Sequence, residues 1–123
     1  MRRIALAAIA ALIAGPACAG VWDGNYSGRL VQQGQNAMAC AKEAPVQMNV
    51  SGDTLTYHHF SNATFTAKVG ANGSFGDQQL NQFGGARSAT MQTLSGSIAQ
   101  GGVITATVTS QYCNYALNLR RQQ

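Results

Sequence analysis

The sequence predicts an all-β protein: a small antiparallel up-and-down barrel of about eight strands, with a β-sandwich as the alternative arrangement. Three observations predict this fold. After residue 20, apolar and polar residues alternate with a period of two, turn residues separate the alternating segments, and a 3.6-residue period is almost absent. Tight turns make successive strands antiparallel neighbours, and a closed barrel leaves no strand edge unpaired.

Residues 1–19 have the features of an export signal. Residues 1–3 are basic, residues 4–14 are apolar, and small residues stand at positions 17 and 19. We expect a signal helix that is cleaved after Ala19, followed by one β domain over residues 20–123. The apolar run is shorter than the ~20 residues of a membrane span. The expected location is the periplasm or the outside of the cell. A lipoprotein anchored through Cys18 is the alternative, which Gly15 and Pro16 fit poorly.

Each alternating segment is expected to turn one face toward the core. In the first segment, residues 22–30, that face carries Trp22, Gly24, Tyr26, Gly28 and Leu30. The other segments are residues 46–51, 55–59, 63–69, 94–98, 104–108 and 113–119, with a short return strand that begins at Phe75.

Turns are expected at residues 51–53, 72–73 and 101–102. Asn72 and Gly73 suit a type I′ turn, in which both central residues have positive φ. Residues 37–44 are helix formers, so a single helical turn is expected there, and Pro45 would end it.

Removal of Cys18 with the leader leaves Cys40 and Cys113, which we expect to form one disulfide in an oxidising compartment. The bridge would close a loop of 73 residues, which chain entropy values at roughly 4 kcal/mol. It would join the loop after the first strand to the last strand. Those two strands are neighbours in a barrel, so this placement agrees with the predicted fold.

The charges and polar residues point away from several function classes. Without the leader arginines the net charge falls from +4 to +2, and the basic residues are scattered, so no nucleic-acid partner is expected. Arg120 and Arg121 are interpreted as a solvated tail.

His58 and His59 would point to opposite faces of one strand, which argues against a shared metal. The four carboxylates after residue 19 lie apart in sequence, and no nucleophile motif is present. We therefore expect no enzymatic activity and no cofactor.

Five aromatic residues are the candidates for lining a ligand site inside the barrel: Trp22, Tyr26, Tyr57, Phe65 and Tyr115. The alternative for Trp22 is a structural one, in which its ring closes one end of the barrel. Small residues at inward positions mean either close packing of strands or room for a small ligand.

The opening residues 22–28 (WDGNYSG), with Cys113-Asn114-Tyr115 near the end, resemble a loose group of short exported β-proteins of Gram-negative bacteria, most of which have no assigned function. The resemblance implies no catalytic residue. The predicted architecture is also similar to avidin-like and lipocalin-like barrels, although the single Trp22 does not match the aromatic set of an avidin pocket. Bacterial protease and lysozyme inhibitors share the size and build.

These observations together predict an exported, non-enzymatic binding module. Its partner would be a small apolar ligand held in the barrel or a secreted protein held at the rim. The alternative function is inhibition of a secreted hydrolase, a protease or a lysozyme, through the loops at residues 32–45 or 78–88.

Overall fold

The structure is a computed structural model that describes residues 20–34, 40–60, 63–81, 90–111 and 113–123. All of its elements are β-strands, and none of these residues is helical. The strands are β1 (Gly24–Gln33), β2 (Glu43–Ser51), β3 (Thr54–His59), β4 (Ala63–Lys68), β5 (Ser74–Asn81), β6 (Thr90–Ala99), β7 (Val103–Thr109) and β8 (Asn114–Arg121). The expected signal helix lies outside the described residues. Within them, no helix has the length and apolar character needed to cross a bilayer.

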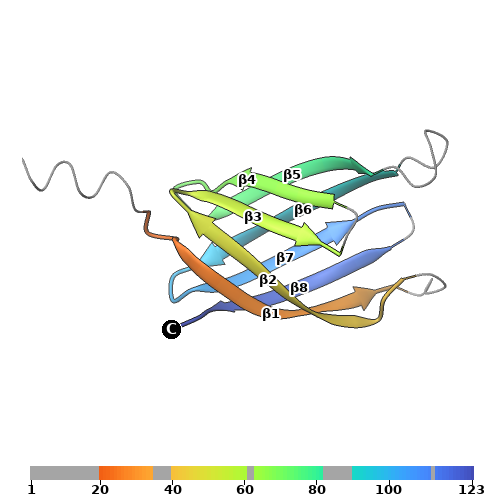
Figure 1. Cartoon of the computed structure of the whole chain (residues 1–123), viewed down its shortest axis with the longest axis horizontal. Helices are drawn as coiled ribbons and strands as arrows, with labels where there is room; N and C mark the ends of the chain where they lie inside the picture. The colour runs from red at the N-terminus through yellow and green to blue at the C-terminus, as the bar shows by residue number, and fades with distance from the viewer. Residues whose placement is uncertain (1–19, 35–39, 61–62, 82–89, 112) are drawn as a thin grey trace, which may run out of the picture.

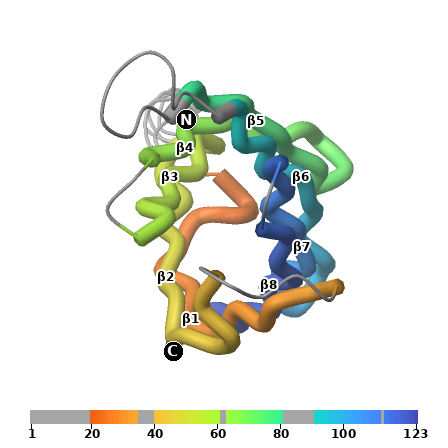
Figure 2. Tube along the Cα trace, turned by 90° about the vertical axis from the view of Figure 1, so that its right-hand side faces the viewer, coloured from red at the N-terminus to blue at the C-terminus, as the bar shows by residue number. Residues whose placement is uncertain are grey.

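The eight strands form one antiparallel sheet that curls into a nearly closed barrel (Figure 1). Strands that follow one another in sequence are hydrogen-bonded neighbours except β4 and β5, and β1 also pairs with β8, which gives the order β4-β3-β2-β1-β8-β7-β6-β5. The two outer strands, β4 and β5, come back side by side, as the end view in Figure 2 shows. The predicted up-and-down barrel is confirmed.

The first and last strands are paired over eight positions, from Tyr26↔Arg121 to Gln33↔Asn114. The break in the hydrogen-bonded sheet therefore lies elsewhere, between β4 and β5 in the middle of the chain. There the Asp77 carboxylate accepts a hydrogen bond from the backbone N–H of Thr66 (2.9 Å). A side chain thus takes the place of a backbone acceptor at this seam.

The alternation seen in the sequence becomes alternating burial. In β4, Phe65 and Ala67 are buried while Thr64, Thr66 and Lys68 are exposed. The other strands show the same alternation where their side chains are described, and the inward side chains form one apolar core. The five aromatic candidates belong to this core: Trp22, Tyr26, Tyr57, Phe65 and Tyr115.

The β2–β3 turn is a type I′ turn, the type that was predicted for residues 72–73. Its two central residues, Gly52 and Asp53, have φ of 58° and 64°, as a type I′ turn requires. At the β4–β5 turn the type I′ prediction is wrong, because Gly73 has positive φ (89°) and Asn72 does not. The Asn72 side chain instead accepts hydrogen bonds from the N–H and the hydroxyl of Ser74 (3.1 and 2.8 Å).

The helical turn expected over residues 37–44 is also not formed where the chain is described. Residues 35–39 lie outside the described residues, residues 40–42 are irregular, and β2 already begins at Glu43. Pro45 lies within β2, opposite Arg29 of β1, rather than at the end of a helix. The extended pairing with β1 outweighs the local helix preference of this segment.

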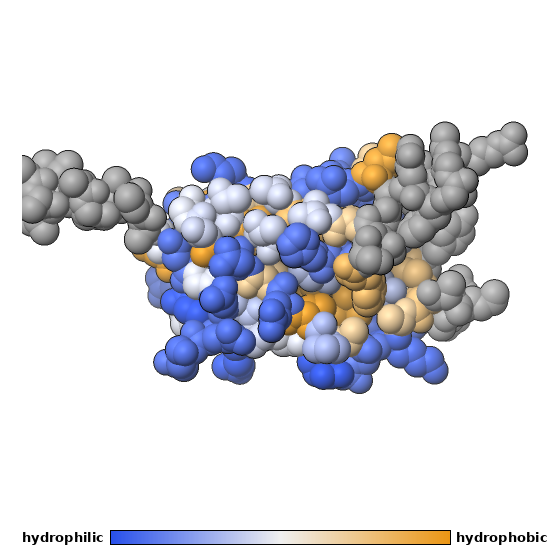
Figure 3. Space-filling view, in the orientation of Figure 1, coloured by the Kyte–Doolittle hydropathy of each residue, from blue (hydrophilic) through white to orange (hydrophobic). Residues whose placement is uncertain are grey.

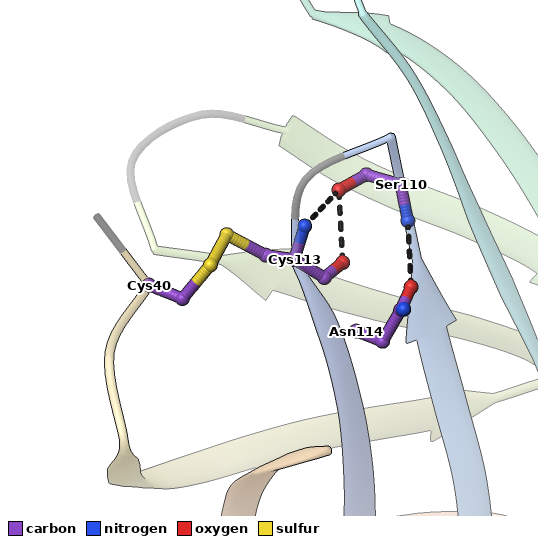
Figure 4. The surroundings of a disulfide bond; sticks show 4 residues. All are labelled: Cys40, Ser110, Cys113 and Asn114. Atoms are coloured by element: carbon purple, nitrogen blue, oxygen red, sulfur yellow. Dashed lines mark hydrogen bonds between the residues drawn. A yellow bond between two sulfur atoms is a disulfide. The ribbon is translucent and has the colours of Figure 1, made fainter. Parts of the chain in front are cut away.

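The predicted disulfide between Cys40 and Cys113 is present, with the two Cα atoms 5.7 Å apart (Figure 4). Cys40 precedes β2 and Cys113 precedes β8, so the bridge lies at the end of the barrel where β1 and β8 pair. Ser110 holds the Cys113 backbone in place: its hydroxyl donates to Cys113 O (2.8 Å) and accepts from Cys113 N–H (3.0 Å). The crosslink therefore joins two segments that are far apart in sequence.

Replacement of Cys113 by Ser, or of both Cys40 and Cys113, should lower the free energy of unfolding by roughly 4 kcal/mol, because the unfolded chain regains the freedom of a 73-residue loop. Thermal melting followed by circular dichroism measures this loss, and the β-strand signal should persist at low temperature. The double variant controls for reactions of the leftover thiol. An unchanged melting temperature, or two free thiols in the exported protein, contradicts the prediction.

Candidate functional site

Strands β2 and β3 pair along only part of their length. Their register runs from Ser51↔Thr54 to Met48↔Tyr57, whereas β2 reaches back to Glu43. Residues 43–47 therefore pair with β1 on one side and with no described strand on the other. Figure 1 shows β2 and β3 diverging toward the right-hand end of the barrel.

The β2–β3 ladder ends at Met48↔Tyr57, and Pro45 prevents it from resuming farther along β2. The N–H of Gln32 donates to Lys42 O (2.8 Å), so Gln32 and Lys42 form a hydrogen-bonded pair. Hydrogen-bonded and non-hydrogen-bonded pairs alternate along an antiparallel ladder. Arg29 and Pro45 lie three pairs farther along, so they form a non-hydrogen-bonded pair. The nitrogen of Pro45 therefore points away from β1, toward β3. Proline has no N–H to donate, so the ladder between β2 and β3 cannot continue through this position.

A depression in the barrel wall, here called the β2–β3 groove, lies where the strands part. Its wall residues come from β1, β2 and the end of β3: Ser27, Gly28, Ala44, Pro45, Val46, Gln47, Tyr57, His58 and Phe60. More than half of them are apolar or aromatic. Figure 3 shows apolar residues gathered where the strands diverge, with hydrophilic residues over the other half of this face.

An aromatic cluster lies beneath the groove and supports it. Tyr57 stacks on Phe65, with 6.2 Å between the ring centroids. His59 packs edge-on against Tyr115 (5.4 Å), and Phe60 contacts both His59 (4.6 Å) and Tyr115 (5.8 Å). The cluster joins β3, β4 and β8, so the floor of the groove is held by three strands.

The prediction for the two histidines is confirmed: they lie on opposite faces of β3. His58 is exposed and hydrogen-bonds Thr64 Oγ1 through Nδ1 (3.0 Å). His59 is 1% exposed, and its Nδ1 shares a hydrogen bond with the Tyr57 hydroxyl (2.9 Å). Burial lowers the pKa of His59 to about 4 and raises the pKa of Tyr57. Both groups are therefore neutral near pH 7, and the pair acts as packing rather than as an acid or base.

Phe60, at the mouth of the groove, has an unusual backbone. Its φ is +53°, and its ring is 44% exposed. A bulky residue in the left-handed region costs about 1–2 kcal/mol relative to the right-handed one. Continuing the β2–β3 register would bring Phe60 opposite Pro45, so the strained residue and the residue without a donor border the same groove.

The structure divides the five aromatic candidates between the two ends of the barrel. Tyr57, Phe65 and Tyr115 are near the groove, and Tyr57 forms part of its wall. Trp22 and Tyr26 are buried at the other end, where the Tyr26 hydroxyl donates to Trp22 O (2.7 Å). The five side chains therefore do not converge on one place, and all of them are part of the buried core.

The interpretation of Arg121 as part of a solvated tail is wrong. Its guanidinium donates to the Tyr26 hydroxyl through Nε (3.1 Å) and Nη2 (2.8 Å), and to Val21 O through Nη2 (3.3 Å). The guanidinium carbon also lies 5.3 Å from the Tyr26 ring centroid. A partner 95 residues away in sequence leaves no local signal for this role.

Asp23 and Asp53, which lie apart in sequence, are near each other in the fold. The backbone N–H of Asp53 contacts Asp23 Oδ1 at 3.5 Å. Glu43 pairs with Arg29 at 2.6 Å in an exposed ion pair, and Asp77 bridges the seam described above. Each carboxylate thus has a structural neighbour. In the described part of the chain, no three His, Cys, Asp or Glu side chains lie close enough together to hold a metal ion.

Comparison of the chain with protein-family models, with curated proteins and with solved structures yields no match. The resemblance carried by residues 22–28 and 113–115 therefore stays an expectation.

The stability of the protein should fall as the pH drops from 6.5 to about 4. In this range the unfolded chain binds a proton at His59 and the folded chain does not, so each pH unit removes about 1.4 kcal/mol until both states are protonated. Chemical unfolding at several pH values measures the slope. His59→Gln should flatten it relative to the natural protein, and the exposed His58→Gln should leave it unchanged. Equal slopes for the His59 variant and the natural protein would contradict the neutral, buried state.

Proposed function

We propose that this protein is an exported, non-enzymatic binding module that accepts an apolar group of its ligand in the β2–β3 groove. The observation that carries the proposal is the presence of both Pro45 and Phe60 in the wall of the groove. Pro45 cannot donate a hydrogen bond to β3, and Phe60 keeps a strained backbone with a half-exposed side chain. Strain of this kind persists where a site requires a particular side chain in a particular place.

The form of the site favours an apolar ligand that lies against the wall of the barrel over one enclosed within it. Tyr26, Tyr57 and Phe65 are at most 1% exposed, and their rings occupy the interior. The groove is open to solvent on the outside, with Val46 and Tyr57 in its floor and Phe60 at its mouth. An aromatic ring or a short aliphatic chain fits such a surface, supplied by a small apolar molecule or by a side chain of a secreted protein.

Two features support export to the periplasm or beyond. The first is the signal-like character of residues 1–19, with small residues at positions 17 and 19. The second is the Cys40–Cys113 disulfide, a bond that persists in oxidising compartments. The absence of catalysis is supported by the roles of the titratable groups: His59 is neutral and buried, and the carboxylates near the strands bind backbone N–H groups or Arg29.

Phe60→Asn tests the groove, because Asn tolerates a left-handed backbone and lacks the ring. We expect the affinity for N-phenyl-1-naphthylamine, an apolar dye that fluoresces outside water, to fall about tenfold. The free energy of unfolding should stay within about 1 kcal/mol of the natural value, since relief of backbone strain offsets the lost ring contacts. The matched control is Met91→Asn, which removes an exposed apolar side chain outside the groove. Equal dye binding by the natural protein and by the Phe60 variant would refute the site.

Inhibition of a secreted hydrolase is the second candidate, and the position of Cys40 favours it. The disulfide ties Cys40, three residues before β2, to Cys113, and a crosslink of this kind lowers the ordering cost that an inhibitor has to meet on binding. Under this alternative, the protein should inhibit a serine protease or a lysozyme in a steady-state assay, and the Cys40→Ser, Cys113→Ser double variant should inhibit less. Full activity of both enzyme types at a large excess of the natural protein would eliminate it.

A further inference from the structure

Gly20, the residue after the expected cleavage point, lies against two carboxylates. Its carbonyl accepts a hydrogen bond from Asp23 N–H (3.2 Å), and its own N–H helps to hold the pKa of Asp23 below the usual range. A Cβ at position 20 would overlap Asp53 Oδ1 and would approach Asp23 Oδ1 at 3.1 Å. The start of the described chain therefore lies beside these two aspartates, and a side chain at position 20 would require Asp53 to move.

Asp53 Oδ1 is buried, and it has no hydrogen-bond partner. A buried carboxylate oxygen without a donor is costly, and native proteins rarely leave one in that state. The backbone of Asp53 is firmly held, since its carbonyl accepts from Val69 N–H (2.8 Å) and its φ of 64° belongs to the type I′ turn. The oxygen thus stays beside Gly20, in a position that calls for a donor.

We propose that hydrolysis of the Ala19–Gly20 bond gives Gly20 an α-ammonium group that pairs with Asp53 Oδ1 as well as with Asp23, so that removal of the leader completes this end of the barrel. In the hydrolysis, which requires a peptidase that accepts small residues at positions 17 and 19, water adds its hydroxyl to the Ala19 carbonyl carbon. The nitrogen of Gly20 leaves with a proton and takes up a second one near neutral pH. This inference rests on the export proposed above.

The change in donors explains how one nitrogen can serve both aspartates. Within the uncleaved chain, the amide of Gly20 has a single N–H, which helps to lower the pKa of Asp23 and leaves Asp53 Oδ1 without a donor. An ammonium group has three N–H donors, enough to serve both Asp23 and Asp53 Oδ1.

A positive charge already acts on one of the two aspartates. The N–H groups of Gly20, Gly52 and Asp53 lower the pKa of Asp23, and the charge of Arg121 adds to this effect. The guanidinium of Arg121 also donates to Val21 O (3.3 Å). The new ammonium would add a positive charge beside Asp23 and Asp53, where Gly20 lies against both side chains.

The pairing connects leader removal with the strands of the groove. Asp53 belongs to the turn between β2 and β3, and these are the two strands that diverge at the opposite end to form the groove. Attaching this turn to the N-terminus holds in place the closed end of the β2–β3 hairpin, from which the two strands run before they diverge. Processing therefore stabilises the part of the barrel on which the site is built.

The test compares the chain that begins at Gly20 with a chain that retains Ala19, each prepared in the natural sequence and as Asp53→Asn. Asn keeps the shape and tolerates the left-handed backbone, but it removes the charge. We expect the Gly20 form to melt about 5 °C above the Ala19 form, and this difference to disappear in Asp53→Asn. Asp77→Asn, at the β4–β5 seam, is the matched control and should preserve the difference. No difference between the natural forms, or an equal difference in Asp53→Asn, would overturn the pairing.

Mass spectrometry of the exported protein provides the independent arm. A mature start at Gly20 supports the processing step, and a start at any other residue overturns it along with the leader on which the export proposal depends. Dye binding in the groove is measured on the same samples and should be equal for the Gly20 and Ala19 forms at low temperature. A failed groove and a failed N-terminal pairing therefore give different results.

Discussion

The pairing of β1 with β8 is the constraint on which the rest of the structure depends. These strands lie at opposite ends of the domain sequence, yet they match over eight positions. Their pairing brings Cys40 near Cys113 and places Arg121 over Tyr26. Without it, the chain would be two four-stranded sheets whose inner faces had no enclosed core. Because these contacts span nearly the whole domain, the barrel can close only when the entire domain is available to fold.

The β2–β3 groove shows a conflict between a complete sheet and an accessible surface. Full pairing would satisfy every backbone group of residues 43–47 on both sides. Pro45 prevents this by removing one donor, while Phe60 ends β3 with a left-handed residue instead of continuing it. The aromatic cluster under the groove, with His59 between Phe60 and Tyr115, supplies the packing that holds this local departure from regular structure.

Much of the fold could be predicted from the sequence, because alternation of apolar residues decides which face of a strand is buried. Residues 63–68 read as a half-buried strand, and the two histidines of β3 could be assigned to opposite faces by parity alone. The disulfide followed from a count of cysteines. Local patterns were misleading where a distant partner decided the outcome: residues 43–44 belong to a run of helix formers but pair with β1, and Arg121 binds Tyr26. The groove was beyond prediction, because it depends on which strand faces the nitrogen of Pro45. The meeting of Asp23 with Asp53 likewise requires the folded chain.

The seam between β4 and β5 has a consequence for association. Two strand edges meet there without a backbone ladder, and an unpaired edge is a template on which a strand of another molecule can assemble. The carboxylate of Asp77 occupies the N–H of Thr66, and Lys68 adds an exposed positive charge on the same strand. An incoming strand would have to displace the Asp77 carboxylate from the Thr66 N–H and to accommodate the charge of Lys68. The charged side chains of Asp77 and Lys68 thus disfavour edge-to-edge aggregation of barrels at the seam between β4 and β5, where the sheet has no backbone ladder.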